Sequence, residues 1–343
     1  MNFLWRKLLF SQSSPAPSEV IYGNLKAWVE LAGVTPTHVQ GVWWPKLDVD
    51  SPGALESCGR WIGLLFHGGG YLLGSARDER SGFSRVPRAL IQRDICSHVL
   101  SLDYTLVSLS GESATSFPLQ LVEALSAYYF LVQTLEVPPD RILLIGDSAG
   151  AHLALSLERY LLESKCLAGP AGIILFSPWC DMTEYDFPPY IPHNTSIKKF
   201  LGSLSPDLLC SPYFSPAFHP PPSHWPATFI SSGANEGFAS SIAALEAQLM
   251  EAGVSVTTHK ATGILERYSH DFLIHAIVET VWPGEVQGCW QQLQAWTTAL
   301  AQTFTGGTTF GEVLVRNIID ITVMGISSGR MAVIFREQCS AKS

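Results

Sequence analysis

The sequence predicts an α/β fold in which a mostly parallel sheet is covered by helices on both faces. Three observations predict it. Short apolar runs bounded by Gly, Pro or Ser have the length and composition of buried parallel strands, at 61–66, 97–102, 141–145, 172–176, 227–232 and 254–259. Amphipathic runs of helical length alternate with them, at 118–136, 149–165 and 240–252. Glycine clusters end three of the strands, where such sheets carry their chemistry.

The predicted strands and helices end at residues that are typical of turns and helix stops. The run WIGLLF ends at a glycine cluster, RILLI stops at Gly146, and GIILF stops at Ser177-Pro178. The helix predicted over 240–252 ends at Gly253, a typical C′ stop. Further helices are predicted near 23–31 and over 285–304. The proline-rich stretch 187–226 cannot be regular core, so we expect an insertion with short helices around 196–209.

Composition narrows the class of protein. Of the 343 residues, 47% are hydrophobic and 15% charged, which excludes a disordered, collagen-like or coiled-coil chain. The net charge of −9 and the lack of a Lys/Arg stripe argue against a nucleic-acid partner. Seven cysteines, an odd number without a CxxC pair, predict neither a disulfide framework nor a structural zinc site. We therefore expect a cytoplasmic protein.

The two ends differ from the body of the chain. Residues 1–18 are an apolar segment followed by a Ser/Pro linker, and Arg6 and Lys7 interrupt the apolar part. It is too short to span a bilayer and lacks the order of a signal peptide. A helix packed on the body is the favoured interpretation, and weak peripheral contact with the ER membrane is the alternative. We expect one domain over 19–305, with a cap from about 19–45 and 187–226, and an atypical tail over 306–343.

The strongest chemical signal is the sequence GDSAG around Ser148. It follows the strand RILLI and precedes an amphipathic helix. A nucleophile elbow needs this context, since the serine sits on a tight turn whose neighbours two residues away must lack bulk. The helix then points its first N–H groups at developing negative charge. A glycine-rich turn with an idle serine is the alternative.

A second motif, HGGGY from His67 to Tyr71, follows the strand WIGLLF. Consecutive glycines let backbone N–H groups approach a substrate oxygen, as an oxyanion hole requires. A flexible turn is the alternative. Phosphate binding is disfavoured because the chain has neither a Walker lysine nor GxGxxG at this position. His67 is interpreted as a residue that braces the loop.

A serine nucleophile needs a base and an acid. In nucleophile-elbow hydrolases the chain order is Ser, acid, His, which leaves the histidines at 193, 219, 224, 259, 270 and 275. His270 is the candidate base because it follows the last strand and begins a helix. Glu236 is the candidate acid, as the only carboxylate in the loop after ATFISS. The alternative for Glu236 is a solvated carboxylate at a helix N-terminus.

Together these motifs resemble the hormone-sensitive-lipase-type branch of the α/β-hydrolase fold, a family of carboxylesterases and deacetylases. The resemblance runs from about residue 61 to 304 and also includes Asp103-Tyr104, Phe117-Pro118, Ser177-Pro178-Trp179 and His270-Asp271-Phe272. It implies an eight-stranded, mostly parallel sheet with a cap. The sequence departs from the family pattern in two places. Glu236 stands where the family usually has an Asp acid, and Ala151-His152 follow GDSAG in a fungal-like variant.

The resemblance also implies the site and the reaction. Ser148 is the nucleophile, His270 the base and Glu236 the acid, and the N–H groups of Gly69, Gly70 and Ala149 form the oxyanion hole. No metal or organic cofactor is needed. The expected substrate is a small hydrophobic ester, with an acetyl or other short acyl group on a sterol or secondary metabolite. Two alternatives remain open, namely an acyltransferase on the same triad and a non-catalytic ligand receptor. The oligomeric state is not predicted.

Overall fold

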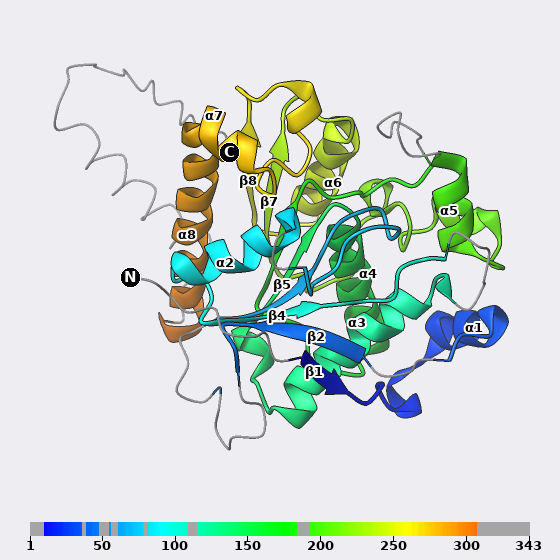
Figure 1. Cartoon of the computed structure of the whole chain (residues 1–343). Helices are drawn as coiled ribbons and strands as arrows, with labels where there is room; N and C mark the ends of the chain where they lie inside the picture. Colours follow the sequence, from blue (N-terminus) through cyan, green and yellow to red (C-terminus); the bar gives the residue numbers. More distant parts are fainter. Residues whose placement is uncertain are drawn as a thin grey trace, which may run out of the picture.

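An eight-stranded sheet runs through the centre of the molecule, in the order β1-β2-β4-β3-β5-β6-β7-β8 (Figure 1). The computed structural model describes residues 10–35, 39–47, 55, 61–78, 81–108, 115–183 and 193–306. The strands are β1 Phe10–Ser13, β2 Val39–Trp44, β3 Ile62–Phe66, β4 His98–Leu102, β5 Ile142–Asp147, β6 Gly172–Phe176, β7 Ala227–Gly233 and β8 Val256–Ala261. The expectations for 1–9, 48–54, 184–192 and 307–343 lie outside the described residues.

Six of the strands pair in parallel, from β4 through β3, β5, β6 and β7 to β8. β1 pairs antiparallel with β2, and β2 pairs antiparallel with β4. The predicted fold class, a mostly parallel eight-stranded sheet, is confirmed. All six strands predicted from apolar runs are present, with ends that move by one or two residues.

The segment 39–44 corrects the predicted extent of the cap, because it is the strand β2. Its side chains are buried on both faces, with Trp43 in one core and Trp44 in the other. Gly41 lies against β4 so closely that an added Cβ would stand 2.7 Å from Leu100 Cδ1. This glycine therefore allows the two strands to pack closely. In the sequence it interrupts an apolar run, and for that reason β2 was not predicted.

Helices cover both faces of the sheet (Figure 1). The helices are α1 Gly23–Ala32, α2 Arg85–Gln92, α3 Leu119–Tyr129, α4 Ala149–Ser164, α5 His193–Leu201, α6 Ala239–Glu251, α7 Ala276–Val281 and α8 Pro283–Gly306. Buried residues of α3, α4 and α6 belong to one core, and those of α2, α7 and α8 to the other. A π-helical turn over Phe130–Thr134 continues α3, so the predicted 118–136 helix is not α-helical throughout. None of the described helices has the length and apolarity needed to cross a bilayer.

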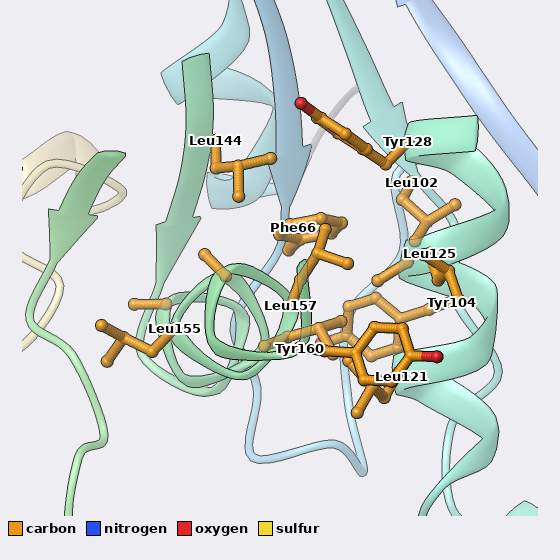
Figure 2. Close-up of a cluster of buried hydrophobic side chains, with 14 of the residues drawn as sticks. Phe66, Leu102, Tyr104, Leu121, Leu125, Tyr128, Leu144, Leu155, Leu157 and Tyr160 are labelled. Atoms are coloured by element: carbon orange, nitrogen blue, oxygen red, sulfur yellow. The ribbon is translucent and has the colours of Figure 1, made fainter. Parts of the chain in front are cut away.

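The first core joins the central strands to α3 and α4. Figure 2 shows part of it, with Phe66, Leu102 and Leu144 from the strands facing helix residues such as Leu125 and Leu157. Each of these five side chains is almost fully buried. Burial of such a side chain contributes about 1.5 to 3 kcal/mol. This packing holds α3 and α4 against the central strands.

The proline-rich insertion contains α5 and short 3₁₀ turns over Pro206–Cys210 and Pro216–Phe218. The ring of Phe200 in α5 stacks on Tyr71 with centroids 4.0 Å apart. The backbone N–H of Phe117 donates to the carbonyl of Phe200 at 2.7 Å, and Trp28 of α1 contacts the Phe117 ring. Both α1 and the insertion therefore meet at Phe117, beside the loop that follows β3.

Glu158 makes the stability of the fold depend on pH. This α4 side chain is buried, its Oε2 has no hydrogen-bond partner among the described residues, and burial raises its pKa to about 8. From about pH 4.5 to 8 the unfolded chain ionises this group while the folded chain keeps the proton. The folded state then binds more protons, so its free energy of unfolding falls as pH rises, by roughly 3 to 5 kcal/mol across the window.

We expect Glu158→Gln to flatten that decline. Urea unfolding at pH 5 and pH 8 measures it, and the variant should gain stability relative to the native chain at pH 8. Glu251→Gln, at an exposed position on α6, is the control and should leave the decline unchanged. Parallel pH dependences in Glu158→Gln and the native chain would contradict the expectation.

Candidate active site

Ser148 lies on the sharp turn between β5 and α4. Its backbone has φ 51° and ψ −115°, a strained conformation for a residue with a side chain. A Cβ at Gly146 would stand 2.3 Å from the Gly150 carbonyl oxygen, and one at Gly150 would stand 2.0 Å from that of Phe66. Neither position can carry a side chain. The two glycines of GDSAG therefore permit the elbow that presents Ser148.

His270 lies in the turn after β8 and reaches the serine. Its Nε2 is 3.0 Å from Ser148 Oγ, although 122 residues separate them in the chain. Two other candidate histidines bond elsewhere, His219 to the carbonyl of Cys210 and His259 to the Gln292 side chain. The side chain of His193 lies outside the described residues. The structure thus brings together the serine and the histidine that the sequence analysis selected.

Glu236 lies in the connection between β7 and α6. Its Oε2 is 3.5 Å from His270 Nδ1, and its side chain is fully buried. Ser177 Oγ donates a hydrogen bond of 2.7 Å to the same Oε2. The glutamate therefore faces the ring nitrogen opposite to the one that faces Ser148. The arrangement has the order of a serine, imidazole and carboxylate triad.

Two further residues complete this arrangement, and the sequence analysis gave them no role although both lie in segments of the predicted resemblance. Ser177 bonds Glu236, and it also accepts a 3.0 Å hydrogen bond from the backbone N–H of Asp271. Asp271 Oδ2 lies 3.1 Å from His270 Nε2. Position next to His270 was a local signal for Asp271. Ser177 was marked by its position at the end of a strand, but its contacts were not predictable, because its partners are 59 and 94 residues away.

The carboxylates shape the electrostatics of His270. Burial acts to lower the pKa of the imidazole, but Asp271 and Glu236 outweigh it and hold the pKa of His270 well above its ordinary value. The side chain is 31% exposed, so solvent reaches the ring. Burial and the charge of Asp271 raise the pKa of Asp147, the residue before Ser148. The site therefore favours an imidazolium beside two carboxylates.

The loop after β3 approaches the elbow with bare backbone. Gly69 and Gly70 have φ of +100° and +62°. A Cβ at Gly68 would stand 2.4 Å from Asp147 Oδ2 and 3.2 Å from Ser148 Cβ. Ala149 begins α4, and the first N–H groups of a helix have no intrahelical partner. The amides selected from the sequence thus lie in a loop and a helix start that meet at Ser148.

Two pairs of ring side chains hold this loop. His67 is buried and stacks on Tyr104 with centroids 4.3 Å apart, and the Tyr104 hydroxyl donates to the His67 carbonyl at 2.6 Å. The Tyr71 hydroxyl lies 2.6 Å from Nδ1 of His152 on α4. Burial lowers the pKa of His152 to about 3, so the ring is neutral where it shares this hydrogen bond with Tyr71. His67 therefore has the bracing position expected of it.

No set of three His, Cys, Asp or Glu side chains with metal-binding geometry occurs in the part of the chain that the structure describes.

The chain belongs to the α/β-hydrolase fold family, whose model matches residues 64–273. Among curated proteins it is similar to steryl acetyl hydrolase 1 of Saccharomyces cerevisiae, with 28% identity over 43% of this chain and 31% of that protein. It is also similar to an acetyl-hydrolase of Streptomyces hygroscopicus, with 34% identity over 35% of this chain and 36% of that protein. The chain thus matches about a third of the length of these relatives.

Solved structures share the fold at low identity. Carboxyl esterase 2 of Tuber melanosporum matches with a TM-score of 0.63 and 17% identity, over 86% of this chain and 87% of that one. A hormone-sensitive-lipase homologue, EstE7, from a metagenome library matches with a TM-score of 0.58 and 22% identity, over 86% and 87%. These structures show the shared fold, and the family model and the curated relatives agree with the predicted resemblance to esterases of the hormone-sensitive-lipase type.

Proposed function

We propose that the protein is a serine esterase that cleaves small hydrophobic carboxylic esters through an acyl-enzyme on Ser148. The observation that carries the proposal is the 3.0 Å approach of His270 Nε2 to Ser148 Oγ on a strained elbow. A hydroxyl becomes a useful nucleophile only when a base takes its proton. The carboxylate of Glu236 on the far side of the ring supports that role for His270.

In the proposed reaction Ser148 Oγ attacks the ester carbonyl while its proton passes to His270 Nε2. The N–H groups of Gly69, Gly70 and Ala149 stabilise the oxyanion, and one such donor is worth about 3 to 4 kcal/mol. The imidazolium then donates its proton to the leaving alcohol. Water attacks the acyl-enzyme in the second half, with His270 again as the base.

The proposed substrate is an acetyl or other short-chain ester of a hydrophobic alcohol such as a sterol or a secondary metabolite. The names of similar proteins support it, among them a versiconal hemiacetal acetate esterase of Aspergillus parasiticus, 29% identical over 34% of this chain and 33% of that protein. Aromatic rings beside the base also support it. The Phe238 ring stands 5.0 Å from the His270 ring and stacks on Trp179.

The test is hydrolysis of p-nitrophenyl acetate, with the acetylated peptide located by mass spectrometry after rapid acid quench. We expect release of p-nitrophenol and an acetyl group on Ser148. Acetylation elsewhere, or no turnover of acetyl, propionyl and butyryl esters, would contradict the proposal. Added alcohol acceptors distinguish an acyltransferase, since it would form a new ester faster than free acid.

A further inference from the structure

His270 has a carboxylate on each ring nitrogen, whereas the proposed triad uses one. Glu236 Oε2 lies 3.5 Å from Nδ1, and Asp271 Oδ2 lies 3.1 Å from Nε2. The same Nε2 stands 3.0 Å from Ser148 Oγ. The nitrogen that must take the serine proton therefore already faces a second acid, to which the proposed function assigns no role.

The fold holds Asp271 in this place. Its backbone φ is +48°, a left-handed conformation that Asp and Asn tolerate better than other residues with side chains. Its N–H donates to Ser177 Oγ, and that hydroxyl donates to Glu236. One serine thus fixes the second acid and the triad acid relative to the same imidazole.

The buried negative charge of Asp271 is stabilised mainly by the imidazole of His270. Its side chain is 7% exposed, and Oδ1 is buried without a hydrogen-bond partner among the described residues. A buried carboxylate is costly unless it is paired. A bare Nε2 lone pair would repel Oδ2 at this distance, whereas a protonated Nε2 donates to it. Asp271 therefore favours the imidazolium over the neutral ring.

Two other titratable groups act on the electrostatics around His270, and burial disfavours the charged form of each. Asp147, at the end of β5, has a pKa raised by burial and by Asp271, which favours its neutral form. His275, in the same turn as His270, has a pKa lowered chiefly by burial, so it too is favoured neutral. Glu236, from the β7–α6 connection, and Asp271 are the carboxylates that lie at the two ring nitrogens.

We propose that Asp271 is a second positioning acid, which holds the protonated Nε2 of His270 and sets the lower pH limit of the enzyme. The inference rests on the proposed function. As Ser148 Oγ bonds to the acyl carbon, its proton moves to Nε2 and the carbonyl electron pair moves to oxygen. Asp271 accepts a hydrogen bond from the new Nε2–H and takes no proton itself. Because Asp271 stabilises the imidazolium, the resting enzyme keeps His270 protonated to higher pH. Once deprotonated, the same imidazole is a stronger base.

The variants Asp271→Asn and Asp271→Gly test this, because both residues tolerate the positive φ and neither carries charge. We expect the acid limb of the kcat/KM profile for p-nitrophenyl acetate to move down by about 1 to 2 pH units in both. The alkaline plateau should fall by about 3- to 10-fold, since the imidazolium loses a charged partner. An acid limb that stays in place in either folded variant would overturn the proposal.

The matched control is Asp94→Asn, an exposed aspartate that also has a positive φ, of 54°. It loses the same charge without contact to His270, and its profile should superimpose on that of the native enzyme. The native enzyme supplies a second test that needs no variant. The rate of Ser148 labelling by a fluorophosphonate should reach half its maximum above the ordinary histidine pKa of about 6.5.

The two proposals fail in different ways. Half-maximal labelling at or below the ordinary histidine pKa would overturn the role of Asp271 even if both variants failed to fold. A native enzyme that neither turns over esters nor labels at Ser148 would instead overturn the proposed function. Normal turnover with an unmoved acid limb in the variants would leave the proposed esterase function intact and overturn only the proposed role of Asp271.

Discussion

Replacing Ser148 with alanine is expected to lower kcat/KM for p-nitrophenyl acetate by at least about 10⁴-fold, as loss of the nucleophile does in other serine hydrolases. Alanine leaves His270 and the backbone amides in place but removes the oxygen that bonds to the acyl carbon. Labelling by a fluorophosphonate should disappear together with turnover. The measurement is the initial rate with the native and variant proteins at matched concentration.

Ser164→Ala is the control for that experiment, because Ser164 ends the same helix, α4, and bonds Cys166 instead of the imidazole. It should keep both turnover and labelling. Undiminished labelling of Ser148→Ala would show that the reactive hydroxyl lies elsewhere and would end the assignment.

Glu236→Gln is expected to lower kcat by about 10³- to 10⁴-fold with little change in KM, by analogy with loss of the triad charge in other serine hydrolases. A glutamine amide cannot compensate the imidazolium that forms when Ser148 gives up its proton. It can also offer N–H to Nδ1 and so favour the wrong tautomer of His270. Steady-state kinetics measure the loss, and circular dichroism checks that the variant is folded.

Glu266→Gln offers a matched control, since this exposed glutamate stands four residues before His270 and has no contact with the ring in the described structure. Its kinetics should equal those of the native enzyme. A Glu236→Gln variant with a rate near the native one would remove Glu236 from the proposed triad.

Local sequence patterns were enough to predict much of the fold and of the candidate site. Strand β5, the elbow and helix α4 were predictable, since an apolar run, small residues around a serine and an amphipathic run follow one another in the chain. The three candidate triad residues were selected by their order and by their position after strands. Such features depend on near neighbours in sequence, and apolar periodicity and glycine spacing record them directly.

Other features were decided only by the tertiary structure. β1 and β2 join the sheet through antiparallel pairing, and Gly41 in β2 is needed only because β4 packs against it. Ser177 bridges Glu236 and Asp271 across 59 and 94 residues of chain. Whether a serine meets two acids, or an aspartate meets an imidazole nitrogen, depends on strand order and loop direction. Residues far apart in the chain acquire those contacts only when the sheet brings its strand ends together.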